Sequence, residues 1–245
     1  MVSLDLTDEL DITDGDRLEV IDDVAWSGGP ATRGSSPVVV PADESNLVSR
    51  ALSVVGRTAA VRLIKRIPAG AGLGGGSADA AAILRWAGRG DSESAVRVGS
   101  DVPFCVTGGR AVVSGIGEIV ERLPFVEASF LTVTPGFGVS TRKVYAAWDE
   151  LGGPTGEGTN DLETAAILAE PRLASWRSLV EAVAGRPPSL AGSGSTWWLE
   201  VSDPASAGEA EALRAMLAGE VERSGTRALV TLCRTAEQAE GITTG

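Results

Sequence analysis

The alternation of apolar and polar positions near the start of the chain predicts β-strands. Within residues 2–12, apolar residues fall mostly on one parity, at Val2, Leu4, Leu6, Leu10 and Ile12. Because side chains of a strand alternate between its two faces, this spacing is typical of a strand with one buried face. Residues 17–21 predict the next strand, and the apolar run within residues 58–67 predicts a third.

A helical spacing replaces this alternation from residue 41 onward. The apolar positions recur three and four residues apart, as on one face of a helix: Leu47, Val48, Ala51, Leu52 and Val55. Asp43 or Ser45 is the expected N-cap, because short polar side chains accept hydrogen bonds from the first N–H groups of a helix. The pattern therefore predicts a helix that begins near these two residues.

The second half of the chain predicts another α+β unit. Residues 110–115 and 118–123 have the pattern of paired strands that close a first domain, and the composition changes at Pro124. A strand over 129–134, a helix over 142–151, a long helix over about 205–223 and a strand over 227–232 follow. We therefore expect two domains, residues 1–124 and 125–245.

A glycine-rich loop joins the third predicted strand to an alanine-rich helix. The segment 67–84 reads IPAGAGLGGGSADAAAIL and holds five glycines, at positions 70, 72, 74, 75 and 76. Glycine has no Cβ, so the backbone N–H groups of such a loop can approach a ligand closely. Ser77 and Asp79 stand where we expect the helix to begin, and a helix N-terminus carries unpaired N–H donors. The combination predicts a phosphate-binding loop.

Three other interpretations of this loop are weaker. Gly70, Gly72 and Gly75 satisfy the spacing of a dinucleotide fingerprint, but the residues that follow the helix do not read as the second strand of a Rossmann unit. A Walker A loop requires a Gly-Lys step, and no lysine lies between Lys65 and Lys143. A flexible hinge would not explain why the glycines adjoin a helix start.

Composition excludes several classes of function. The chain has no histidine, which removes Ser-His-Asp triads and imidazole acid-base chemistry. Its net charge of −12 and the absence of a basic stripe disfavour nucleic-acid binding. No membrane-length apolar run and no signal peptide are visible, so we expect no membrane partner and a cytoplasmic location. Two distant cysteines, Cys105 and Cys233, are typical of a reducing compartment.

The glycine segment resembles the ATP-phosphate loop of the GHMP small-molecule kinases. Within that superfamily it is most similar to the 4-diphosphocytidyl-2-C-methyl-D-erythritol kinases, which usually have a second serine where this chain has Ala78. The resemblance implies a two-domain α+β fold, with an N-terminal domain like domain 2 of ribosomal protein S5 and a ferredoxin-like C-terminal domain. It also implies that ATP is bound by Pro68, Ala69, Gly70, Ala71, Gly72, Leu73, Gly74, Gly75, Gly76, Ser77 and Ala78.

Two residues outside the loop are also candidates for ATP binding. Asn46 matches an asparagine that contacts adenine in the resembled family. Its position alone favours a role in the cap region of the helix, and the resemblance reverses that preference. Lys65 matches a lysine near the nucleotide, and a solvated lysine at a strand end is an equally good interpretation, so the sequence leaves the role of Lys65 open.

Further motifs follow in the order that the family shows. Asp101 stands in an Asp-Val-Pro-Phe step, where the family's aspartate acts on the substrate hydroxyl; the alternative is a cap or turn residue. The Gly-Val-Ser-Thr…Tyr passage implies that Thr141 lies near phosphate and that Tyr145 lies against cytosine. The turn Gly192, Ser193 and Gly194 resembles the third GHMP motif, which packs against the phosphate loop.

The implied reaction is transfer of the γ-phosphoryl group of ATP, with Mg²⁺, to the 2-hydroxyl of 4-diphosphocytidyl-2-C-methyl-D-erythritol. Phosphoryl transfer depends mainly on alignment and charge stabilisation, so a backbone loop and one carboxylate suffice in outline. The sequence assigns no metal ligands and no oligomeric state. Another GHMP small-molecule kinase, or a nucleotide-binding protein without catalysis, is the alternative.

The resemblance also suggests that part of the family's N-terminus is missing. In the family, a strand with a lysine near the catalytic aspartate and a Gly-Tyr-His substrate loop precede the segment that matches residues 1–10. We therefore expect that Met1 is not the true start of the functional protein, and that the form given by residues 1–245 is poorly stable and weakly active.

Overall fold

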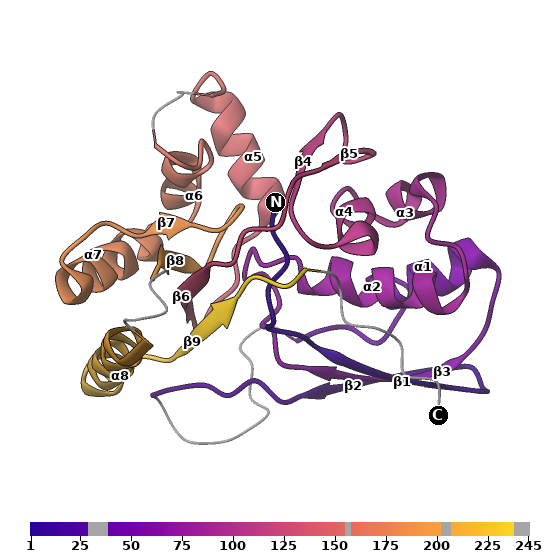
Figure 1. Ribbon diagram of the computed structural model, residues 1–245, viewed down its shortest axis with the longest axis horizontal. Helices are drawn as coiled ribbons and strands as arrows, with labels where there is room; N and C mark the ends of the chain where they lie inside the picture. Colours follow the sequence, from indigo (N-terminus) through magenta and orange to yellow (C-terminus); the bar gives the residue numbers. More distant parts are fainter. Residues whose placement is uncertain (29–38, 155–157, 202–206, 238–245) are drawn as a thin grey trace.

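The computed structural model describes residues 1–28, 39–154, 158–201 and 207–237 of the 245-residue chain. Its first half contains a mixed sheet of three strands, β1 (Glu9–Thr13), β2 (Arg17–Asp22) and β3 (Ala60–Lys65), in the order β1-β3-β2. Strand β3 is antiparallel to β1 and parallel to β2. Helices α1 (Leu47–Val55) and α2 (Gly75–Trp86) lie together on one face of this sheet (Figure 1).

The apolar stripes of the two helices and the inner face of β3 make the first core. Val48, Leu63, Ile83 and Leu84 are almost completely buried there. Two short helices, α3 (Ser92–Val98) and α4 (Val102–Thr107), follow α2 and lead into a hairpin of β4 (Ala111–Ser114) and β5 (Ile119–Arg122). The chain thereby carries the β4–β5 hairpin to the side of the first half that faces the second half (Figure 1).

The second half has a four-stranded antiparallel sheet in the order β7-β8-β6-β9. Its elements are β6 (Ser129–Pro135), α5 (Thr141–Glu150), α6 (Glu163–Ala169), α7 (Arg172–Ala184), β7 (Ser189–Leu190), β8 (Trp197–Glu200), α8 (Ala207–Arg223) and β9 (Ala228–Arg234). This strand order, with helices between β6 and β7 and between β8 and β9, is the ferredoxin-like arrangement. The fully buried Leu131, Leu173 and Trp197 lie in its core.

Backbone hydrogen bonds join the two halves. The Ala236 N–H donates to the carbonyl of Ser3 (2.9 Å), and the Asp5 N–H donates to the carbonyl of Arg234 at the end of β9 (3.0 Å). Ser27 exchanges two backbone hydrogen bonds with Ala228 (2.7 and 3.0 Å). Each half has its own core, on either side of residue 124, but segments of the first half are fixed to the second sheet. The boundary after residue 124 stays a prediction.

Most predicted elements are confirmed, and two are displaced. Regular strand structure begins only at Glu9, because residues 2 and 4 form isolated bridges to Arg110 and Thr235 rather than to a neighbouring strand. Helix α1 is capped by Asn46 and not by Asp43 or Ser45, since Asp43 accepts the Ser45 N–H in a local turn (2.8 Å). Residues 205–206 of the predicted long helix lie outside the described residues.

Two further observations complete the fold. Cys105 and Cys233 are both free thiols. Among the described residues, no helix combines the length and the apolar composition that a membrane crossing requires.

Replacing Leu131 by alanine should lower the free energy of unfolding by about 2–5 kcal/mol, because the side chain is fully buried in the second core. Leu168 is 56% exposed, so Leu168→Ala is the matched control and should change stability by less than about 1 kcal/mol. Urea denaturation of both variants measures the difference. Equal losses would contradict this assignment of the core.

Candidate functional site

The glycine loop ends in an open helix N-terminus. Helix α2 begins at Gly75, and its N-cap Gly74 has a left-handed backbone (φ +70°) and no side-chain cap. The first helical hydrogen bond runs from the Ala78 N–H to the carbonyl of Gly74 (2.9 Å). The N–H groups of the three residues between them therefore have no acceptor within the helix. Together with the partial positive charge of the helix end, they form an anion-binding surface.

Our prediction that the helix begins at Ser77 was wrong by two residues. Gly74 supplies the turn by its left-handed conformation, so Gly75 and Gly76 become part of the first helical turn. Asp79 is consequently not a capping residue. It lies inside the helix, with 4% of its surface exposed.

The second half of the protein holds the start of the loop through the backbone. The carbonyl of Gly70 accepts hydrogen bonds from the N–H groups of Val139 (3.1 Å) and Ser195 (3.2 Å). The carbonyl of Ala71 accepts one from the Thr196 N–H (3.0 Å). The residues that directly follow the turn 192–194 therefore contact the loop, and the contribution of this turn to a binding site stays a prediction.

The contact between this loop and the turn of residues 192–194 leaves no room for a side chain on Gly72. Gly72 has φ +75°, and a Cβ on it would lie 2.2 Å from the carbonyl oxygen of Ala191. The amide of Asn160 donates to the carbonyls of Leu190 (2.8 Å) and Gly192 (2.7 Å) and so fixes the turn from its other side. The structural role that we assigned to the segment around Asn160 is consistent with these two hydrogen bonds.

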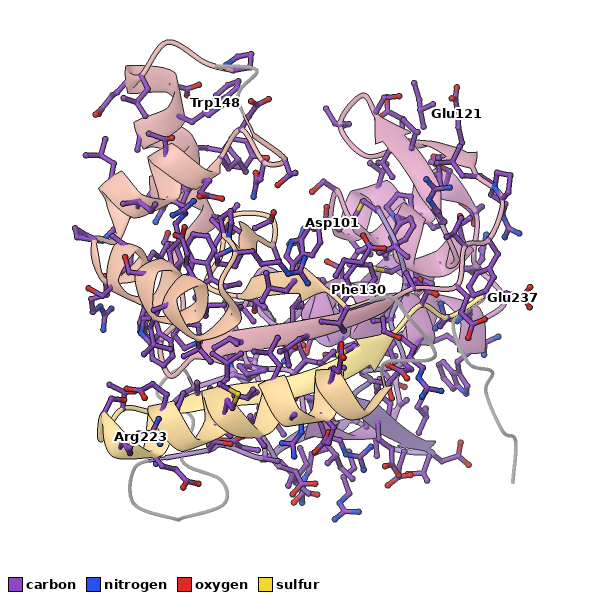
Figure 2. All side chains as sticks on the ribbon, turned by 60° about the vertical axis from the view of Figure 1, so that its left-hand side comes forward. Asp101, Glu121, Phe130, Trp148, Arg223 and Glu237 are labelled. Carbon is purple, nitrogen blue, oxygen red and sulfur yellow. The ribbon has the colours of Figure 1, made fainter. Side chains whose placement is uncertain are left out.

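A cleft of about 740 Å³ lies between the β4–β5 hairpin and helix α5. Its lining residues are Met1, Ser100, Asp101, Arg110, Ala111, Val112, Val113, Ser114, Gly115, Ile116, Gly117, Leu123 and Tyr145. The turn of the hairpin packs directly on the segment that leads to Asp101, since a Cβ on Gly117 would lie 1.9 Å from the carbonyl oxygen of Ser100. Figure 2 shows Asp101 between the hairpin and the helices of the second half.

Asp101 precedes α4 but does not act as its cap. Its backbone is in the right-handed helical region (φ −88°, ψ −10°), and its side chain makes no capping hydrogen bond. Within the described part of the chain, its carboxylate has no ion-pair partner. Partial burial in the cleft raises the pKa of Asp101 above its ordinary value, because desolvation disfavours the charged form. This carboxylate is therefore available to a ligand in the cleft.

Helix α5 connects the cleft with the glycine turn. At its first residue, the hydroxyl of Thr141 is hydrogen-bonded to that of Ser193 in the turn (2.9 Å). One turn later Tyr145 lines the cleft, with 49% of its surface exposed and its ring edge-on to Trp148. A half-exposed aromatic ring in a cleft offers a surface on which a planar group can stack.

A buried ionic cluster lies at the base of the glycine loop. The ammonium of Lys65 is hydrogen-bonded to the carboxylates of Asp8 and Asp79, in the second case at 2.8 Å. The three side chains are 2–6% exposed. Burial alone would lower the pKa of Lys65, but the two carboxylates outweigh it and the pKa is raised. Burial also raises the pKa of Asp79 to about 7, and Asp8 adds to this effect while Lys65 opposes it.

Comparison with known proteins places this geometry in a family. Residues 46–109 match the GHMP kinases N terminal domain. The fold is similar to the crystal structure of a 4-(cytidine 5'-diphospho)-2C-methyl-D-erythritol kinase, with a TM-score of 0.62, 26% identity, and coverage of 95% of this chain and 88% of that one. It is also similar to homoserine kinase from Cytophaga hutchinsonii (TM-score 0.63, 15% identity, coverage 97% and 89%), a likeness of fold alone.

A relative that the chain matches over most of its length identifies the family. The chain is 34% identical to the 4-diphosphocytidyl-2-C-methyl-D-erythritol kinase of Paracoccus denitrificans over 224 residues, which are 82% of this chain and 81% of that protein. The chain belongs to the 4-diphosphocytidyl-2-C-methyl-D-erythritol kinase family. With the relative from Thermoanaerobacter pseudethanolicus the match is 39% over 127 residues, and there the chain spans only 44% of that protein's length. The predicted GHMP kinase fold is confirmed.

The two outlying ATP-binding candidates of this family member have other structural roles. Asn46 is the N-cap of α1: its side-chain oxygen accepts the Val48 N–H (2.9 Å), and its amide nitrogen donates to the carbonyl of Pro41 (2.7 Å). The capping interpretation is confirmed, and the adenine contact stays a prediction. A nucleotide contact by Lys65 receives no support, because its ammonium is enclosed by Asp8 and Asp79.

Sequence reasoning missed Asp8 and the packing role of the Gly115–Gly117 turn. Asp8 stands in a polar stretch, Thr-Asp-Glu, that looks like solvated strand sequence, and its partners are 57 and 71 positions away along the chain. In the sequence, Gly117 looks like an ordinary residue of a hairpin turn, and nothing indicates that it packs on another segment. The only available signal was Lys65, a lysine at the end of an otherwise apolar strand, which calls for a buried acidic partner.

Gly72→Ala and Gly74→Ala should differ in stability although both glycines have nearly the same positive φ (+75° and +70°). Both variants incur the cost of a left-handed alanine, about 1–2 kcal/mol. Only at Gly72 does the new Cβ collide with backbone, since nothing lies within 4 Å of a Cβ on Gly74. We expect thermal unfolding to show a clearly larger loss for Gly72→Ala. Equal melting temperatures would mean that the loop does not pack against the turn as described.

Proposed function

We propose that this protein transfers the γ-phosphoryl group of ATP to the 2-hydroxyl of 4-diphosphocytidyl-2-C-methyl-D-erythritol. The observation that carries the proposal is the carboxylate of Asp101, which lies in the cleft with no partner among the described residues and with a raised pKa. A carboxylate used only for capping would be hydrogen-bonded at the helix start, and Asp101 is not. The family names supply the acceptor, which the geometry alone would not identify.

The glycine loop is the group that would bind the triphosphate. Within residues 68–78, Gly75, Gly76 and Ser77 present backbone N–H groups at the N-terminus of α2, and nothing lies within 4 Å of a Cβ placed on Gly74. This open side lets a phosphate come within hydrogen-bonding distance of the backbone. In a protein with a net charge of −12, such local donors are needed to offset repulsion of an anionic ligand.

Asp101 would orient the attacking hydroxyl and accept its proton. As the oxygen of the acceptor forms its bond to the γ-phosphorus, the bond from that phosphorus to the bridging oxygen of ADP breaks, and the hydroxyl proton passes to Asp101. Its raised pKa makes the carboxylate a better proton acceptor than an aspartate of ordinary pKa. Tyr145, which also lines the cleft, would stack on the cytosine ring, and Thr141 would lie near phosphate beside the glycine turn.

Magnesium fits this arrangement as a phosphate-bound ion. Within the described residues, no group of three or more histidine, cysteine or acidic side chains could hold a metal. Mg²⁺ commonly needs only one or two protein ligands, because substrate phosphates and water complete its coordination. Ser77, in the first turn of α2, supplies a hydroxyl oxygen for this purpose. When bound, the ion would neutralise phosphate charge.

Asp101→Asn should lower kcat by about 10²–10⁴, the range for loss of a positioned acid or base, while the affinity for an ATP analogue stays nearly unchanged. Asp149→Asn, an exposed aspartate of α5, is the control and should retain full activity. Steady-state kinetics with the purified acceptor gives kcat, and calorimetric titration gives the affinity. If the wild type binds ATP but phosphorylates no acceptor in a panel of GHMP kinase substrates, the protein binds nucleotide without catalysis.

Tyr145→Ala should raise KM for the cytidine acceptor by about 5- to 150-fold, because base stacking on an aromatic ring contributes about 1–3 kcal/mol. The KM for ATP should not change. Tyr145→Phe keeps the ring and should behave like the wild type. A similar rise in both KM values, or a large drop in melting temperature, would instead make Tyr145 a structural residue.

A further inference from the structure

Asp8, Lys65 and Asp79 connect the two ends of the glycine loop. One oxygen of the Asp8 carboxylate accepts the N–H groups of Arg66 (2.6 Å) and Ile67 (2.8 Å), which immediately precede the loop. Its other oxygen binds the ammonium of Lys65, which also binds Asp79, on the helix that follows the loop. The loop of residues 68–74 is therefore closed at its base by three buried side chains.

The cluster lies directly beside the helix end that would bind phosphate. A Cβ placed on Gly75, the first residue of α2, would lie 3.3 Å from the Asp8 carboxylate. Asp79 is one turn further along the same helix, and its carboxylate points to Lys65 rather than to solvent. A change in any of the three side chains is therefore transmitted to the backbone N–H groups of the first helical turn.

Burial of the cluster is costly unless its charges remain matched. Removing an ionised group from water has a large free-energy cost, and removing one partner of a buried ion pair leaves an uncompensated charge. The ion pair of Lys65 with Asp79 also ties α2 to the strand that precedes the loop, so the loss of either charge releases that tie.

We propose that Lys65, Asp8 and Asp79 are positioning residues: they hold the glycine loop in its phosphate-binding conformation, and the ammonium of Lys65 does not itself touch the nucleotide. The identity of the ligand, ATP, rests on the proposed function; the positioning of the loop does not.

The central experiment compares Lys65→Met, Asp79→Asn and the double variant with an exposed pair on strands β3 and β1. Arg62 of β3 and Asp11 of β1 form a salt bridge at 3.5 Å with about half of each side chain exposed, so Arg62→Met and Asp11→Asn are matched controls. Affinity for a non-hydrolysable ATP analogue is measured by calorimetry well below each melting temperature. Both cluster variants should bind it at least 10-fold more weakly, and the controls within twofold of the wild type.

The double variant separates positioning from direct contact. If Lys65 acts through Asp79, the loss of affinity in Lys65→Met/Asp79→Asn should be smaller than the product of the losses in the two single variants. Removing the Lys65 ammonium leaves the Asp79 carboxylate buried without its partner, and the second substitution removes that unpaired charge. If Lys65 contacts phosphate directly, Lys65→Met should weaken binding equally in both backgrounds while Asp79→Asn alone has no effect. That result overturns the proposal, as does a lowered melting temperature with unchanged affinity in every variant.

Hydrogen exchange tests the inference without any ligand. Exchange of the backbone amides of residues 70–76 should be faster by at least 10-fold in Lys65→Met and Asp79→Asn than in the wild type and the two controls. Unchanged exchange in the loop refutes positioning. If the wild type binds no ATP analogue, the proposed function fails, whereas faster exchange in the loop still supports the positioning role.

Discussion

Close contact between two glycine-rich segments is the constraint on which the site depends. The loop of residues 70–72 and the turn of residues 192–194 meet backbone to backbone, through hydrogen bonds from Ser195 and Thr196 and through the approach of Gly72 to the Ala191 carbonyl. A side chain on Gly72 would push the loop away from the turn. The glycine loop therefore owes its position to the second half of the chain, although the first half supplies its residues.

The cleft is assembled in the same shared manner. Asp101 and the β4–β5 hairpin come from the first half, and Tyr145 comes from helix α5 of the second. The first residue of helix α5, Thr141, is hydrogen-bonded to Ser193 of the glycine turn. This helix therefore links the turn that contacts the glycine loop to the cleft that Tyr145 lines. A fixed separation between the nucleotide and the acceptor suits phosphoryl transfer, in which alignment of the reacting groups supplies much of the rate.

Local sequence patterns predicted most helices and strands, whereas contacts between residues far apart in the sequence could not be predicted. Strands β2 and β3, helix α5 and the hairpin follow from periodicity because their buried faces repeat along the sequence. The partner of Lys65 could not be predicted in this way, since Asp8 reaches it only after the sheet has formed. The local rule for helix caps predicted a capped helix start near residue 45, but Asn46 and not Asp43 or Ser45 makes the capping hydrogen bond.

The backbone pairing of Asp5 with Arg234 has a consequence for how the chain is made. These residues are 229 positions apart, and the segment around Asp5 also crosses to Gly109 beside the hairpin. During synthesis at about 5–20 residues per second, Asp5 must wait roughly 10–50 s before its partner leaves the ribosome. Until then β6 lacks its β9 neighbour, and its edge remains open to pairing with other chains. The site is thus completed only after the last strand has been synthesised, and a nascent chain halted before residue 228 would carry the glycine loop without its finished second sheet.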